Sequence, residues 1–243
     1  MLSINVESDK RKDVPVRYII SLGQDCCTGL NIKRVGLKVA SYPFDWTSAT
    51  YKHVSLLLKQ GIKDNYIIDG VSRTFDETGL VFVHHDIKDT TDRAYLERCY
   101  ARLMFVIKEQ KERVLFLRSQ QGFGDRDIEG INLCRNTIKE LNPELDFDIM
   151  SICTKHLPDT PGVHIYRAGE NIIHADVAAR THWWADNVHA NGDHDIWHVL
   201  LFSFNYDLVP NEKHHSSSHI PHEAHFDTPY NKHVYFKNVV DLF

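Results

Sequence analysis

Two adjacent cysteines, Cys26 and Cys27, follow a short apolar run in the segment IISLGQDCCTGL. Residues 16–23 are rich in β-branched residues and end in Gly23, a pattern typical of a buried strand. Residues 24–35 carry apolar positions at helical spacing. A thiol in the first turn of a helix faces unpaired backbone N–H groups and the positive end of the helix dipole. Because this environment lowers the pKa of a thiol, the sequence predicts a thiolate nucleophile here.

The two thiols need not share a role. One residue rotates the side-chain direction by about 100° around a helix, so one thiol can face the sheet while the other faces a cleft. Cys27 shares the apolar face with Leu30, which leaves Cys26 as the predicted nucleophile. The alternative is that both cysteines are inert packing residues, because free cysteine is among the most frequently buried residue types.

A thiolate nucleophile needs a base and a group that orients the base. In the segment DIWH, Asp195 and His198 are three residues apart and share a face if the segment is helical. We therefore predict His198 as the base and Asp195 as its partner, an order similar to that of lipase-like hydrolases of the Ser-Gly-Asn-His type. An ordinary exposed Asp–His pair is the alternative interpretation. His164, in the apolar segment 162–169, is a competing base at the Cys-to-His separation of papain-like enzymes.

The segment SYPFDW places an acid between two aromatic residues. Pro43 restricts the backbone, and Phe44 and Trp46 alternate with Asp45. If the aromatic rings are buried, Asp45 points the other way, where it can orient a histidine or bind a substrate hydroxyl. Alternatively, Asp45 caps the helix that follows. Trp46 is predicted to contact substrate.

Three further residues are predicted to contact substrate. Gly23 and Gln24 lie in the turn before the cysteines, and Arg118 ends the apolar segment 113–119. An arginine at the carboxyl end of a strand is well placed for a phosphate or a carboxylate. The glycines that follow Arg118 lack the spacing of a nucleotide-binding loop, and a surface turn is the alternative interpretation.

The blocks SLGQDC and LKVASYPFDW resemble those of a family described as "putative papain-like cysteine peptidase", which is found in bacteria and large viruses. The resemblance rests on about 30 residues and implies a thiol-centred site, with Cys26 at the position of the family's cysteine. The matching residues are Ser21, Leu22, Gly23 and Cys26, then Gly36 and Leu37, and then Ser41, Tyr42, Pro43, Phe44, Asp45 and Trp46.

Buried strands alternate with amphipathic helices along the chain. Strands are predicted at 16–23, 79–86, 113–119, 146–153 and 162–169, and helices at 24–35, 48–60, 91–112 and 128–141. Residues 194–204 fit a helix better than a strand. This pattern predicts an α/β fold: a single three-layer domain over residues 1–243, with a mainly parallel sheet and helices on both faces. Residues 1–14 are predicted to be a polar tail and residues 211–233 an irregular histidine-rich segment.

Composition excludes several classes of function. The 243 residues are 42% hydrophobic and carry a formal net charge of −5, which argues against a nucleic-acid partner. No apolar run approaches about 18 residues, and the N-terminus has no signal-peptide pattern, so we expect a cytoplasmic protein without a membrane partner. Five cysteines without a Cys-x-x-Cys pair argue against a disulfide framework or a cysteine zinc site.

No metal or other cofactor is predicted. His219, His222 and His225 are spaced three apart and could bind zinc, but a solvated loop is the favoured interpretation of that segment.

Two functions follow from these residues. The first is a thiol-dependent hydrolase or acyl transferase, similar to a cysteine peptidase, that acts on a small-molecule, peptide or glycan substrate. The second is a sugar-nucleotide-dependent, glycosyltransferase-like or glycan-binding α/β protein. In the second case the turn after residue 23 binds phosphates and Cys26 is structural.

Overall fold

A computed structural model describes residues 2–7, 11, 13–23, 27–45, 47–62, 81–82, 85, 89–121, 127–180 and 193–209. Gln24, Cys26 and Trp46 lie outside the described residues, and so do the glycines after Arg118 and the histidine-rich segment 211–233. Residues 1–210 form one structural unit. The single domain predicted over residues 1–243 stays a prediction.

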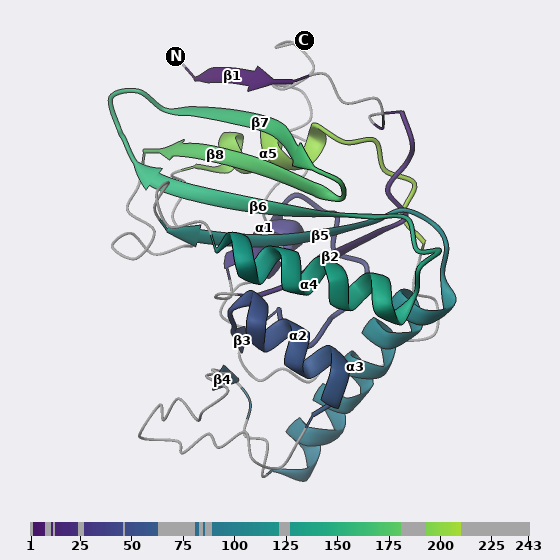
Figure 1. Cartoon of the computed structure of the whole chain (residues 1–243). Helices are drawn as coiled ribbons and strands as arrows, with labels where there is room; N and C mark the ends of the chain where they lie inside the picture. Colours follow the sequence, from purple (N-terminus) through teal and green to yellow (C-terminus); the bar gives the residue numbers. More distant parts are fainter. Residues whose placement is uncertain are drawn as a thin grey trace. The chain divides into compact units, whose positions relative to one another are not determined.

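A six-stranded sheet forms the centre of this unit (Figure 1), with the strand order β1-β7-β8-β6-β5-β2. Strands β2, β5, β6 and β8 are mutually parallel, β7 is antiparallel to β8, and β1 is parallel to β7. The strands are β1 (Ser3–Val6), β2 (Tyr18–Ser21), β5 (Val114–Gln121), β6 (Phe147–His156), β7 (Gly162–Gly169) and β8 (Ile172–Ala179).

Helices cover both faces of the sheet, which confirms the predicted α/β fold. Helices α2, α3 and α4 lie on one face and helices α1 and α5 on the other (Figure 1). Thr50, Asp89 and Asp127 cap α2, α3 and α4 through their side chains. The helices are α1 (Cys27–Arg34), α2 (Tyr51–Gln60), α3 (Thr90–Glu109), α4 (Ile128–Leu141) and α5 (His194–Phe202), and a short antiparallel pair joins β3 (Thr47–Ser48) to β4 (Val81–Phe82).

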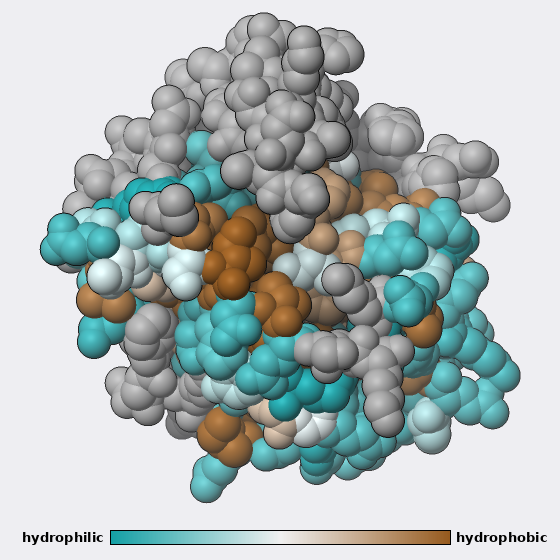
Figure 2. All heavy atoms as spheres, turned by 90° about the horizontal axis from the view of Figure 1, so that it is seen from above, coloured by the Kyte–Doolittle hydropathy of each residue, from teal (hydrophilic) through white to brown (hydrophobic). Residues whose placement is uncertain are grey.

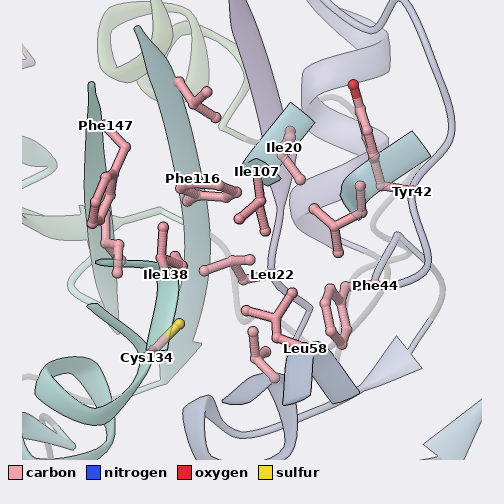
Figure 3. Close-up of a cluster of buried hydrophobic side chains, with 14 of the residues drawn as sticks. Ile20, Leu22, Tyr42, Phe44, Leu58, Ile107, Phe116, Cys134, Ile138 and Phe147 are labelled. Atoms are coloured by element: carbon pink, nitrogen blue, oxygen red, sulfur yellow. The ribbon is translucent and has the colours of Figure 1, made fainter. Parts of the chain in front are cut away.

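The alternation of side chains along the buried strands separates two hydrophobic cores. Ile20 of β2 and Phe116 of β5 point toward α2, α3 and α4, where they pack with side chains such as Ile138 (Figure 3). Their neighbours Ile19 and Leu115 point toward α1 and α5. Because both faces are covered, these strands have near-continuous apolar sequences.

The structure contains strands that the periodicity did not predict. Ser3–Val6, expected within the polar tail, form the edge strand β1, in which all four residues are exposed. Ile172–Ala179 form β8, which is inserted between β6 and β7. Residues 194–202 are helical, as favoured. Figure 2 shows the molecule from above: among the described residues, hydrophobic ones gather near the centre of the view, and smaller hydrophobic spots lie among hydrophilic residues toward the edges.

An ionic network closes the end of the sheet at which β5 and β6 begin. The carboxylate of Asp148, which has no exposed surface, lies 2.9 Å from Nη2 of Arg113, 3.0 Å from Nη1 of Arg167 and 3.3 Å from Nη1 of Arg11. Arg113 also donates to the backbone carbonyl of Val14. The network therefore ties the segment before β2 to the start of the sheet.

Among the described residues, no helix combines the length and apolar character needed to cross a membrane.

Candidate functional site

The carboxyl ends of β2 and β5 meet at one edge of the sheet. The backbone N–H of Leu22 donates to the carbonyl of Leu117 at 2.7 Å, so Gly23 lies beside the second half of strand β5. Gly23 has a φ of +81°, and a Cβ atom there would lie 3.0 Å from the carbonyl oxygen of Thr47 and 3.3 Å from Cβ of Ala49. Only glycine combines this backbone conformation with such a close approach. The loop before α2 therefore packs directly against the end of β2.

Helix α1 begins at Cys27, directly after the predicted nucleophile. Cys27 and Leu30 are buried, as predicted from their shared apolar face. Thr28 attaches the first turn of α1 to β5, because its hydroxyl oxygen lies 2.7 Å from that of Ser119. Cys26 itself lies outside the described residues, so its role stays a prediction.

Asp45 is buried against α1. Its Oδ2 accepts a hydrogen bond from the backbone N–H of Tyr42 at 2.8 Å and lies 3.0 Å from Nζ of Lys38. A Cβ atom on Gly29 would lie 3.1 Å from both the backbone oxygen and Oδ1 of Asp45, so the acid sits directly over the helix. Asp45 does not cap α2, because Thr50 accepts the hydrogen bond from the third helical residue, His53.

Arg118 is also buried at this edge, on the face of the sheet covered by α2. Its guanidinium group contacts the carbonyl of Ala49, the side chain of Gln120 and the ring of Tyr51. The sequence predicted Arg118 at the carboxyl end of a strand, whereas β5 continues to Gln121, and it did not predict the contacts with Tyr51 and Gln120. Gln120 could have been predicted, because residues two apart in a strand share a face and Gln120 is two residues after Arg118. No local pattern predicts the contact with Tyr51.

Asp195 forms a bidentate salt bridge with Arg180 that the sequence did not predict. Its two carboxylate oxygens accept from Nη1 and Nη2 of Arg180 at 2.7 and 2.9 Å, and Oδ1 also accepts from the backbone N–H of Ile196. Burial raises the pKa of Asp195, but the hydrogen bonds and the charge of Arg180 together lower it by more, so the net shift of the pKa is downward. Within the described residues the carboxylate contacts these groups and not His198.

His198 lies on the same helix, with its ring stacked on that of Phe202 at a centroid distance of 4.2 Å. Burial lowers the pKa of His198, so the imidazole is neutral at neutral pH, the form that a general base requires. His164 is instead half-buried on β7, 3.2 Å from a carboxylate oxygen of Glu7. Strands β8, β6 and β5 separate β7 from β2, about 19 Å at about 4.8 Å per strand.

Acidification is expected to destabilise the protein in part through His198. The pKa of His198 in the folded chain lies below its ordinary value of 6.5, because burial disfavours the charged ring. Between these two pKa values only the unfolded chain binds the proton, so the free energy of unfolding falls as pH drops through about 6.5. The pKa of His194 is lowered too, by burial and by Arg34.

Urea unfolding at about pH 7.5 and about pH 5.5 measures this effect. Between the two pH values, the free energy of unfolding should fall by less for His198→Gln than for the wild type. Equal losses in the two proteins would contradict the assignment.

A metal site is not apparent in the part of the chain that the structure describes, where no three His, Cys, Asp or Glu side chains gather around one point. The histidines at 219, 222 and 225 lie outside that part, and their alternative role as zinc ligands stays a prediction.

The family resemblance is confirmed by comparison with known families. A family model described as "Putative papain-like cysteine peptidase" matches residues 17–78. The match spans β2, α1, β3 and α2, and thus Gly23, Cys26 and Asp45, but not Arg118 or α5. It supports a cysteine-peptidase-like relationship at the level of the family. No curated protein and no solved structure matches the chain significantly.

Proposed function

We propose that the protein is a thiol-dependent hydrolase or acyl transferase with Cys26 as its nucleophile. The observation that carries the proposal is that Cys26 directly precedes α1 (Cys27–Arg34) in the chain, and that α1 follows the carboxyl edge of the parallel strands β2 and β5. Open α/β sheets bind their ligands at this edge. The backbone N–H groups in the first turn of a helix favour a thiolate and can stabilise an oxyanion beside it.

The proposed reaction proceeds through a thioester. His198 removes the proton of the Cys26 thiol, and the resulting thiolate sulfur attacks the carbonyl carbon of the substrate, whose oxygen becomes an oxyanion. When the oxyanion collapses, the bond to the leaving group breaks and the leaving group takes a proton from His198. His198 then removes a proton from water, or from an acceptor nucleophile, which attacks the thioester and releases Cys26.

Two acids are candidates for the group that supports this chemistry. Asp45 lies over Gly29, in the first turn of α1. Because Cys26 directly precedes this turn in the chain, this position supports Asp45 as the acid near the nucleophile. Asp195 is held by Arg180 one turn before His198 and would act by fixing the start of α5. Gly23, Gln24, Arg118 and Trp46 are proposed to contact the substrate.

An acyl-trapping experiment tests the proposal. Incubation of the full chain with p-nitrophenyl acetate is expected to give a burst of nitrophenolate and one acetyl group on Cys26, identified by peptide mass mapping. Cys26→Ser should show neither the burst nor the adduct, whereas the matched control Cys27→Ser should keep both, because Cys27 is a buried packing residue. An adduct of equal yield in Cys26→Ser would refute the proposal.

A second candidate is a sugar-nucleotide-dependent or glycan-binding protein in which Cys26 is structural. The buried guanidinium group of Arg118 favours it, because phosphate groups are common ligands of arginine. Thermal-shift measurements with nucleotide sugars test this candidate, and stabilisation in Cys26→Ser as large as in the wild type would support it.

A further inference from the structure

Two buried arginines, one just before β5 and one in its second half, differ in their partners. Arg113 precedes the strand and is 2% exposed, and Arg118 lies in its second half and is 6% exposed. Arg113 has a buried counter-charge, because its Nη2 lies 2.9 Å from Oδ2 of Asp148. No carboxylate among the described residues contacts Arg118.

The partners of Arg118 are neutral. Nε and Nη2 donate to the carbonyl of Ala49 at 3.3 and 3.1 Å, and Nη1 donates to Oε1 of Gln120 at 2.9 Å. The guanidinium carbon lies 4.6 Å from the centre of the ring of Tyr51. A guanidinium group has five N–H donors, so two of those of Arg118 donate to no residue that the structure describes.

The acidic side chains that lie near Arg118 do not supply the missing negative charge. Burial raises the pKa of the Cys134 thiol to about 12 and that of the Tyr51 hydroxyl to about 12, although Arg118 acts to lower both. Both groups are therefore neutral at neutral pH. The hydroxyls of Tyr51 and Ser151 adjoin each other, but neither makes a hydrogen bond of ordinary geometry to a described residue. This part of the molecule thus holds a cation together with unused hydroxyl groups.

A buried charge without a counter-charge is costly, because the loss of hydration is not repaid by a partner. Arg118 nevertheless directly follows Leu117, which pairs with Ser21 at the end of β2, and the carbonyl that it binds belongs to Ala49, which contacts the end of β2 beside Gly23. We propose that Arg118 binds an oxyanion, the carboxylate or phosphate group of the ligand, through its two remaining N–H groups. That this ligand is the substrate rests on the proposed function, whereas the binding of the anion does not.

The test compares two anions on the full chain. Unfolding temperatures are measured while sodium phosphate or sodium acetate is added, with ionic strength held constant by sodium chloride. We expect one of the two to stabilise the protein saturably. A preference for phosphate identifies a phosphorylated ligand, and a preference for acetate identifies a carboxylate. Arg118→Gln should weaken this binding by more than about tenfold, since a charged hydrogen-bond donor is lost.

Controls separate this proposal from the thiol chemistry. Arg17→Gln, which removes another arginine beside β5 but one paired with Asp207, should keep the wild-type affinity. Cys26→Ser should also keep it, so a failure of the acyl-trapping experiment would leave this result intact. Arg118→Lys retains the positive charge but lacks the planar guanidinium group, so its affinity for the anion should lie between those of the wild type and Arg118→Gln.

Two results would overturn the proposal: no stabilisation by either anion beyond that of sodium chloride, or equal stabilisation of Arg118→Gln. If Arg118→Gln does not fold, anion binding is tested instead on the wild-type protein, through the arginine Nε–H signals in its NMR spectrum. One of these signals should shift saturably with the stabilising anion, and unchanged signals would overturn the proposal.

Discussion

Iodoacetamide at about pH 7 is expected to alkylate Cys26 at least ~1000-fold faster than Cys99 or Cys134. Burial raises the pKa of the Cys99 thiol to about 11 and that of the Cys134 thiol to about 12. At neutral pH about one in 10⁴ Cys99 thiols and one in 10⁵ Cys134 thiols are therefore ionised, whereas a thiol with a pKa near 7 is about half ionised. Cys27 and Cys153 are buried as well.

Peptide mass mapping over a series of pH values measures this selectivity. The alkylation rate of Cys26 should follow an apparent pKa well below about 8.5, the value of an ordinary thiol. Cys27→Ser is the matched control and should leave the profile unchanged, whereas Cys26→Ser should remove the fast phase. Slow labelling spread over all five cysteines would count against a thiolate at the start of α1 and favour the second candidate function.

Asp148→Asn is expected to lower the free energy of unfolding by about 3–5 kcal/mol, the usual result of removing one partner of a buried ion pair. Asparagine keeps the shape of the side chain but removes the charge that faces three arginines. Arg113, with 1% of its side chain exposed, would then be a buried cation without its carboxylate partner. Its contacts to the carbonyls of Arg11 and Val14, which anchor the N-terminal segment, should weaken with it.

Urea unfolding of the two proteins measures this change as a shift of the midpoint at constant slope. Asp207→Asn is the matched control, since Asp207 pairs with Arg17 at the surface with 72% of its side chain exposed. Exposed pairs contribute about 0–1 kcal/mol, so the control should remain close to the wild type. A loss below about 1 kcal/mol for Asp148→Asn would show that the network contributes little to stability.

The network around Asp148 and the site around Arg118 lie toward opposite ends of the same strand, β5. The first holds its charges in pairs, and the second leaves a cation for a ligand. If both stability and anion binding behave as expected, substitutions at the start of β5 will affect folding, and substitutions at its carboxyl end will affect ligand affinity.

Hydrophobic patterning alone was sufficient to locate most of the buried strands and most of the helices. Near-continuous apolar runs located β2, β5 and β6, and apolar residues at helical spacing located α3 and α4 to within a few residues. It missed β1, because four exposed residues show no burial pattern. It also missed β8, whose pairing depends on a tight turn with β7 in which Asn171 has a φ of 58°.

The candidate site divides in the same way. Residue types and a short motif were enough to select Cys26, Asp45 and Arg118 as candidates. Three features are visible only in the folded chain: Asp195 binds Arg180, Asp45 lies over Gly29, and Arg118 is buried without a carboxylate partner among the described residues. The physical reason is that burial and counter-charge depend on contacts between residues far apart in the chain. Arg118 donates to the carbonyl of Ala49, 69 residues away in the chain, and no local sequence pattern can predict that contact.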